Sequence, residues 1–208
     1  MALFEHPDFD KHEQVAFHHD KSTGLKAIIA VHNTRLGPSL GGCRMWPYAS
    51  SDEALTDVLR LSSGMSYKAA MANLPKGGGK AVIIGNPREH KSEALMQAMG
   101  RFVDSFNGSY IVAEDSGISV QDINQMASQT KYASGNHARY SIDGIKPDGN
   151  PAPSTSYGVF CGIKAAVKHV YGTGLQGKTV AIQGIGTGCL ALARTLHRPV
   201  AQWLYGEI

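Results

Sequence analysis

Three residues combine a reactive side chain with a position where chemistry is common. Lys80 follows three consecutive glycines and opens an apolar run, Lys68 precedes it by twelve positions, and Asp115 comes just after another apolar run. A lysine in a crowded, partly desolvated place can act as a base, because burial disfavours its ammonium form and lowers its pKa. Residue type alone favours a plainer interpretation, in which Lys80 is solvated and follows a flexible loop.

Lys68 and Asp115 also have plain alternatives. Lys68 follows a predicted helix over residues 51–67, where a cation interacts favourably with the helix dipole. Asp115, with Glu114 beside it, follows a predicted strand, and the end of a strand is a common place for chemistry in α/β folds. Both acidic residues could equally mark the end of the strand and do nothing more.

Glycine makes up 24 of the 208 residues, which exceeds the usual share of about 7%. The glycines gather in three clusters, where the backbone is expected to approach something closely. The first cluster, RLGPSLGGCRMWPY (35–48), contains Gly41 and Gly42, whose bare backbone N–H groups suit a carboxylate or another anion. A simple turn explains this cluster equally well.

The second cluster, PKGGGKAVIIG (75–85), fails as a phosphate-binding P-loop. Leu74 stands where that motif needs its first glycine, and Ala81 stands where it needs serine or threonine. These glycines also precede a predicted strand, whereas a P-loop precedes a helix. The pattern therefore predicts a strand that begins with Lys80, next to three residues without side chains.

The third cluster, QGIGTG, contains Gly184, Gly186 and Gly188 between a predicted strand and a predicted helix. This order is typical of the turn that holds the pyrophosphate of a dinucleotide at a helix N-terminus. Cys189 occupies the usual place of the third glycine, directly after Gly188. Glu207 lies 23 positions after Gly184, near the ~20 expected for an acidic residue that binds the ribose. An ordinary tight strand-to-helix turn is the alternative.

The elements that must position these residues alternate between strands and helices. Glycine, proline, asparagine and aspartate then interrupt the periodicity at about residues 135–153, which indicates a loop or a crossing between domains. The chain therefore predicts an α/β fold with domains at 1–150 and 151–208. The expected strands are 25–32, 80–85, 109–114, 178–183 and 200–206; the expected helices begin after Ser50, Ser92 and Ser119 and cover about 155–170 and 188–197.

Composition excludes several functional classes. A net charge of +3 is too small to favour nucleic acid or a membrane surface, and no apolar run approaches the ~20 residues of a membrane span. The N-terminus has no signal-peptide pattern, so we expect a cytoplasmic protein. The nine histidines show no metal-ligand spacing, His18 and His19 are expected to be an exposed pair, and we expect no metal site. Three scattered cysteines, Cys43, Cys161 and Cys189, predict neither a disulfide framework nor a zinc site.

Five segments together are more specific than any one of them. In chain order they are LGPSLGGCRMWPY, GMSYKAAMANLPKGGGKAVIIGNP, AEDSGIS, NPAPSTSYGV and GKTVAIQGIGTG. Over about residues 10–197 the chain resembles the Glu/Leu/Phe/Val family of amino-acid dehydrogenases, nearest its leucine, phenylalanine and valine branch. The resemblance implies a homo-oligomer that uses NAD. It also implies reversible oxidative deamination of an apolar L-amino acid to the 2-oxo acid and ammonia.

The same resemblance implies roles for residues of the first domain, which would be an α/β substrate domain. Lys80 would activate the water that attacks the imine, which requires a neutral amine. Asp115 would pass a proton to and from the substrate amine. Lys68 would bind the substrate carboxylate, together with backbone N–H groups of Gly41 and Gly42.

The second domain would be the start of a Rossmann-type dinucleotide-binding domain. Glu207 favours NAD over NADP, because its carboxylate would repel a 2′-phosphate. The remaining residues that the resemblance assigns line the substrate pocket (Leu40 and Met65), lie near the nicotinamide amide (Thr155) or form the pyrophosphate turn (Gly184, Gly186, Thr187 and Gly188).

Two hypotheses follow from the length of the chain. A dinucleotide-binding domain usually needs two βαβαβ halves, and the 58 residues after position 150 supply only the beginning of one. In the first hypothesis, the chain is the N-terminal portion of an amino-acid dehydrogenase. In the second, it is a catalytically inactive remnant that serves as an interaction or assembly protein. The family pattern at Lys68, Lys80 and Asp115 favours the first.

Overall fold

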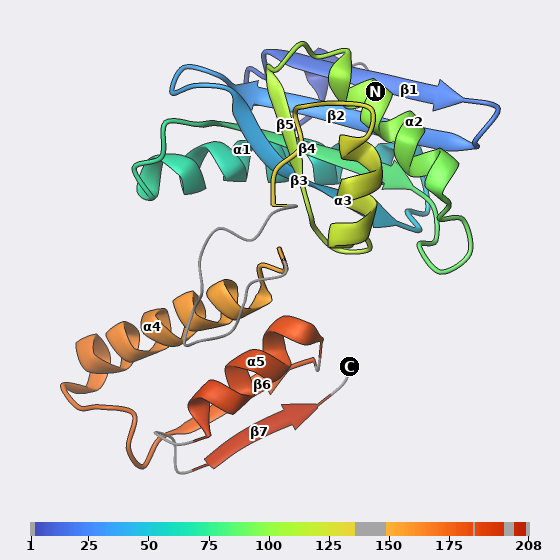
Figure 1. Ribbon diagram of the computed structural model, residues 1–208. Coiled ribbons are helices and arrows are strands. Elements are labelled where there is room, and N and C mark those ends of the chain that lie inside the picture. The colour runs from blue at the N-terminus through green and yellow to red at the C-terminus, as the bar shows by residue number, and fades with distance from the viewer. Residues whose placement is uncertain (1–2, 136–148, 185, 198–201, 207–208) are drawn as a thin grey trace. The chain divides into compact units, whose positions relative to one another are not determined.

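A computed structural model describes residues 3–135, 149–184, 186–197 and 202–206 (Figure 1). The chain divides into two compact units. Unit 1 contains the described residues up to 135 together with Gly149, and unit 2 contains the described residues from Asn150 onward.

Unit 1 is built on a five-stranded sheet with the strand order β1-β2-β4-β3-β5 (Figure 1). β2 runs antiparallel to both β1 and β4, whereas β3 runs parallel to both β4 and β5. β3 therefore lies between β4, which carries Lys80, and β5, which precedes Asp115. The strands are β1 (Gln14–Asp20), β2 (Leu25–Asn33), β3 (Ser39–Trp46), β4 (Gly77–Ile84) and β5 (Tyr110–Ala113).

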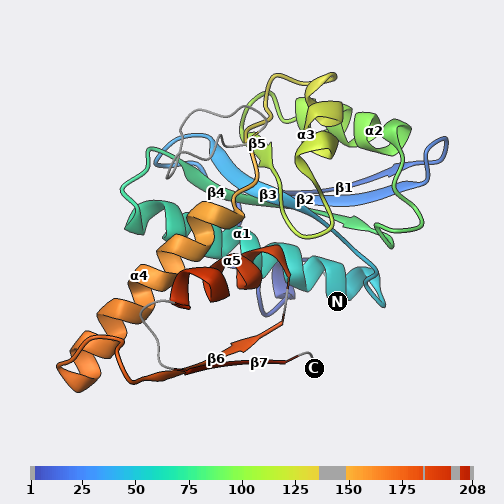
Figure 2. The same ribbon diagram turned by 60° about the horizontal axis from the view of Figure 1, so that its bottom comes forward.

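Helices cover both faces of this sheet (Figure 2). α1 (Ser51–Met71) packs against one face, while α2 (Glu93–Asp104) and α3 (Val120–Ala127) pack against the other. A short 3₁₀ helix, η1 (Leu3–Glu5), precedes the first strand. Because both faces are covered, β2 contributes alternate residues to two cores, which explains its almost continuously apolar sequence.

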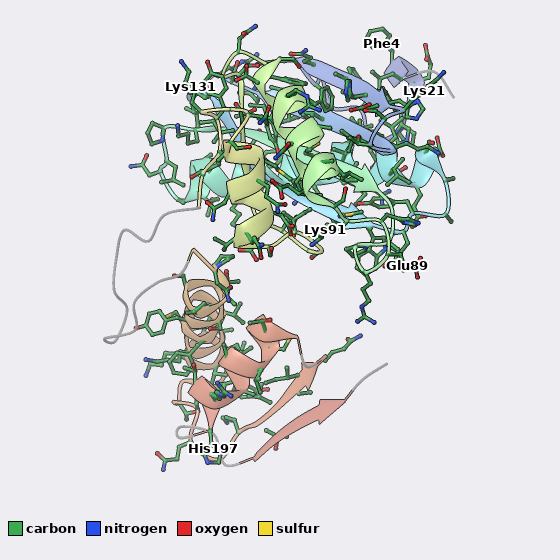
Figure 3. All side chains as sticks on the ribbon, turned by 45° about the vertical axis from the view of Figure 1, so that its right-hand side comes forward. Phe4, Lys21, Glu89, Lys91, Lys131 and His197 are labelled. Atoms are coloured by element: carbon green, nitrogen blue, oxygen red, sulfur yellow. The ribbon has the colours of Figure 1, made fainter. Side chains whose placement is uncertain are left out.

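The three helices begin where the serines predict. Ser50 Oγ accepts the N–H of Glu53, and Ser92 Oγ accepts the N–H of Leu95. Ser119 and Asp122 form a complete capping box at α3, in which each side chain binds the other residue's backbone N–H. Lys91 Nζ also donates to Asp122 Oδ2 at 2.7 Å, so this helix start is tied to the segment before α2 (Figure 3).

The structure corrects the interpretation of two glycine clusters. The glycines at 77–79, expected to precede a strand that begins with Lys80, lie inside β4. Gly41 and Gly42, for which a turn or an anion site was expected, lie inside β3. Sequence analysis also missed β1, an edge strand whose side chains are mostly exposed. Propensity disfavours glycine in strands, but close approach of neighbouring backbone and side chains requires it here.

Unit 2 contains a helix and one βαβ arrangement. α4 (Ala152–Tyr171) ends at Gly172, which adopts a left-handed conformation with φ 67°. β6 (Thr179–Gln183) pairs in parallel with β7 (Gln202–Gly206), and α5 (Thr187–Leu196) lies between them in the chain. The α/β fold predicted from the sequence is confirmed. No helix in the described ranges has the length and apolar character that a membrane crossing needs.

Candidate functional site

The centre of the site is a contact between Lys80 and Asp115 across the sheet of unit 1. Lys80 lies in the middle of β4 and is only 5% exposed. Its Nζ donates a hydrogen bond to Asp115 Oδ2. Asp115 follows β5, and its other oxygen, Oδ1, accepts the N–H of Ser116 at 2.6 Å. The fold thus brings an almost fully buried amine onto a carboxylate 35 positions further along the chain.

Two glycines of the intervening strand make this contact possible. A Cβ atom on Gly42 would lie 2.7 Å from the Cβ of Asp115, and one on Gly41 would overlap the carbonyl of Gly79 in β4. Any side chain at Gly42 would therefore push Asp115 away from Lys80. Tyr110 stabilises the same strand, because its hydroxyl donates to the Gly41 carbonyl at 2.8 Å.

The environment of Lys80 favours the neutral amine. Burial lowers its pKa from the ordinary value of 10.5 to about 8, and the positive charges of Arg44 and Lys68 act in the same direction. The adjacent carboxylate of Asp115, when ionised, opposes this shift because it stabilises the ammonium. With a pKa of about 8, a substantial fraction of Lys80 is available as a base in mildly alkaline solution.

Arg44 connects this centre to α1, and sequence analysis missed it. Arg44 lies on β3 and its Nε is 3.7 Å from Asp115 Oδ2. Its Nη1 donates to Asp57 Oδ2 at 2.9 Å, and the Tyr48 hydroxyl donates to the same oxygen at 2.6 Å. One signal for Arg44 was available: it lies two positions after Gly42 in β3, and residues two apart in a strand lie on the same face of the sheet.

The other predicted substrate residues also lie in unit 1. Lys68 is in the last turn of α1, where it is exposed and forms no ion pair with a described residue. Met65 is half-buried in the same helix, and half-buried Leu40 in β3 pairs with Gly78 of β4. The structure therefore places Lys68 near enough to influence Lys80 electrostatically.

The predicted cofactor residues lie in unit 2, apart from Glu207, which lies outside the described residues. Gly184 closes β6 with φ 88°, and Gly186 caps α5 in an extended conformation. Among the described residues, no side chain caps α5, and Cβ atoms on Gly184, Gly186 or Gly188 would meet none of their atoms within 4 Å. This open helix start, which includes Thr187, fits a pyrophosphate group. Thr155 is exposed in the first turn of α4.

The sequence model of the Glu/Leu/Phe/Val dehydrogenase dimerisation domain matches residues 11–132 of the chain. The chain belongs to this family. The expectation drawn from the five segments is thereby confirmed. The matched region contains Lys68, Lys80 and Asp115, and it ends before unit 2 begins.

Individual relatives agree with this membership. The chain is 48% identical over 213 residues to a leucine dehydrogenase from Geobacillus stearothermophilus, with coverage of 100% of the chain and 56% of that protein. It is 47% identical over 209 residues to an L-tryptophan dehydrogenase from Nostoc punctiforme, with coverage of 100% of the chain and 57% of that protein. A crystal structure of L-tryptophan dehydrogenase from N. punctiforme matches with a TM-score of 0.69 at 45% identity, covering 99% of the chain and 57% of that structure. The chain thus spans little more than half the length of these relatives.

Proposed function

We propose that the chain is the N-terminal portion of an oxidoreductase, an NAD-dependent amino-acid dehydrogenase. The reaction is the reversible oxidative deamination of an apolar L-amino acid of the leucine, valine or phenylalanine type to the 2-oxo acid and ammonia. The observation that carries this proposal is the buried Lys80 with a lowered pKa, in contact with Asp115. The names of the relatives, which are leucine, tryptophan and phenylalanine dehydrogenases, support the same reaction class.

Each residue of the unit 1 site has a distinct task in this proposal. Neutral Lys80 accepts a proton from the water that attacks the imine carbon. Asp115, in contact with Lys80, exchanges a proton with the substrate amine. Lys68, which is exposed and has no described ionic partner, binds the substrate carboxylate together with backbone N–H groups of Gly41 and Gly42. The half-buried side chains of Leu40 and Met65 contribute to the wall that faces the apolar side chain of the substrate.

The cofactor is assigned to unit 2. NAD, when bound, supplies the hydride acceptor that the reaction requires. The open turn formed by Gly184, Gly186, Thr187 and Gly188 holds the pyrophosphate, because its backbone N–H groups and the dipole of α5 favour an anion. Thr155 contacts the nicotinamide amide, and Glu207 binds the ribose hydroxyls.

We also propose that the protein is a cytoplasmic homo-oligomer. The family model that matches unit 1 describes a dimerisation domain, which supports association through this part of the chain. Light scattering on the purified 208-residue chain tests the association directly. A dimer or larger species is expected at micromolar concentration, and a monomer at every concentration would contradict it.

The decisive experiment is a kinetic assay of the full-length gene product. Production of NADH is measured at alkaline pH with leucine, valine, phenylalanine and tryptophan. We expect turnover with at least one of these amino acids. The absence of turnover with all four would overturn the assignment, and the inactive assembly protein would then be the better hypothesis.

Three alanine variants separate the roles of the lysines. Lys80→Ala is expected to remove nearly all turnover, whereas Lys68→Ala is expected mainly to raise the KM for the amino acid. Lys21→Ala, in the exposed turn between β1 and β2 (Figure 3), is the matched control and is expected to change neither parameter. The opposite effects on kcat and KM would show that the roles of Lys80 and Lys68 are exchanged.

A further inference from the structure

We propose that Arg44 is a positioning residue for the pair formed by Lys80 and Asp115. One planar guanidinium connects the reactive carboxylate, at the end of β5, to the Asp57 carboxylate on α1. The role in catalysis rests on the proposed function, whereas the electrostatic coupling between Arg44 and Lys80 does not.

Arg44 is held firmly from the side of α1. Its Nη1 donates to Asp57 Oδ2 at 2.9 Å, with both side chains about one quarter exposed. Tyr48 donates to the same oxygen, and burial and the nearby Asp57 carboxylate raise the pKa of Tyr48, so that it stays a donor. A charged hydrogen bond shielded from water in this way is stronger than an exposed ion pair, which is worth little.

The opposite edge of the guanidinium faces Asp115. Arg44 Nε is buried and donates no hydrogen bond to a described residue, yet it lies 3.7 Å from the oxygen of Asp115 that also accepts from Lys80. An unsatisfied buried donor costs about 1–3 kcal/mol, so a small rotation of Asp115 toward Arg44 is favoured once Lys80 releases this oxygen. Arg44 is thus an alternative partner, which keeps the carboxylate in place while Lys80 changes its protonation state.

Arg44 also favours the neutral form of Lys80. Arg44 and Lys68 disfavour the ammonium of Lys80, whereas the carboxylates of Asp115 and Asp57 favour it. The Cys43 thiol, whose pKa burial raises to about 12, carries no charge near pH 8. Of the two positive charges, Arg44 lowers the pKa of Lys80 more than Lys68 does. It also neutralises part of the Asp115 charge that Lys80 would otherwise experience alone.

The geometry requires arginine at this position. Nη1 and Nε of one rigid fork serve two carboxylates that belong to different elements. A lysine has a single nitrogen, so it could keep one of these contacts but not both. Arg60 offers a matched control, because it lines the same 410 Å³ cavity on this face of the sheet yet pairs with Asp8 instead.

The test measures the pKa of Lys80 in the 208-residue chain, without any assay of activity. Lysines are labelled with acetic anhydride across a pH series, and the extent at Lys80 is read by peptide mass spectrometry in the wild type, Arg44→Met, Arg44→Lys and Arg60→Met. Circular dichroism confirms that each variant is folded. Arg44→Met is expected to raise the pKa of Lys80, and a rise of one unit would lower its labelling rate at pH 8 about fivefold.

The variants give a definite order if the proposal is correct. Arg60→Met should label like the wild type, Arg44→Lys should be intermediate because it keeps the charge, and Arg44→Met should label slowest at pH 8. Equal rates in Arg44→Met and Arg60→Met would overturn the proposal. If Arg44→Met does not fold, a rate for Arg44→Lys equal to the wild type would overturn it.

A second measurement separates this proposal from the proposed function. In the active full-length enzyme, Arg44→Lys should move the rise of kcat with pH to higher pH, with little change in the KM for the amino acid. A shifted labelling profile in a protein that shows no dehydrogenase activity would support the coupling and refute the proposed function. An unshifted labelling profile in an active enzyme would refute the coupling and support the proposed function.

Discussion

Burial of Lys80 has a cost in folding free energy that depends on pH. Its pKa is about 8 in the folded state, against about 10.4 in an unfolded chain, so the unfolded state binds more protons between these values. The cost is therefore full below pH 8 and disappears as the pH rises through 10.4. Between pH 7 and 9.5 this group alone should increase the free energy of unfolding by about 2 kcal/mol.

Lys80→Met should remove this contribution to the pH dependence. Urea unfolding at pH 7 and 9.5 gives the free energy of unfolding of the wild type and of the variant. The change in this free energy between the two pH values should be larger in the wild type, and the difference between the two proteins is the contribution of Lys80. Other groups that titrate in this range affect both proteins equally. The same change in the free energy of unfolding between pH 7 and 9.5 in both proteins would mean that Lys80 has an ordinary pKa in the folded state.

Some residues of the site could be identified from sequence, and others could not. The positions of Lys80 after glycines and of Asp115 after a strand made them candidates, but only the family resemblance assigned them roles. Arg44 and Asp57 were not identified, because their importance arises from contacts across the sheet and with α1. Such contacts depend on tertiary packing and leave no periodic signal in the chain.

At the scale of elements, Gly78 of β4 is required by the packing of α1. A Cβ atom on Gly78 would overlap the backbone nitrogen of Ser66 in that helix. Gly78→Ala should therefore destabilise the chain by about 1–3 kcal/mol, because neither the strand nor the helix can move freely. Thermal or urea unfolding measures the loss.

Gly64→Ala, within α1 itself, is the matched control. A Cβ atom there would meet no atom of a described residue within 4 Å, so only the helix propensity changes. This variant should be more stable than the wild type by about 0.5–1 kcal/mol. Equal effects of Gly78→Ala and Gly64→Ala would refute the close packing of β4 on α1.

The elements found by pattern and those missed differ in how they are stabilised. β2 and the three capped helices carry their signals locally, as an apolar run and as serine caps. β3 contains two glycines and pairs with a strand that contains three, so its propensity for extended structure is low. Its position between β4 and β5 compensates for that propensity, and this tertiary contribution cannot be derived from local sequence.

At the scale of the whole molecule, the two units differ greatly in their cores. The described residues of unit 1 form two apolar clusters, one on each face of the sheet. Among the described residues of unit 2, the apolar cluster has only four buried members: Leu175, Ile182, Ala193 and Leu196. Unit 2 should therefore open at a much lower free energy than unit 1.

Hydrogen exchange followed by mass spectrometry tests this difference. Amides of β2 and β4 should be the most protected, and amides of α4 and β6 should exchange at least about a hundredfold faster, since about 2.7 kcal/mol separates such rates. Uniform protection across both units would show that the chain opens as one cooperative body.

The cysteines provide a chemical measure of these opening events. Cys43, on the strand between Lys80 and Asp115, is fully buried, and burial raises the pKa of its thiol to about 12. Cys161 is exposed on α4. An alkylating reagent should therefore modify Cys161 first, whereas modification of Cys43 must wait until the sheet separates. The rate at Cys43 then reports how long Lys80 and Asp115 stay in contact, in a protein that carries no added probe.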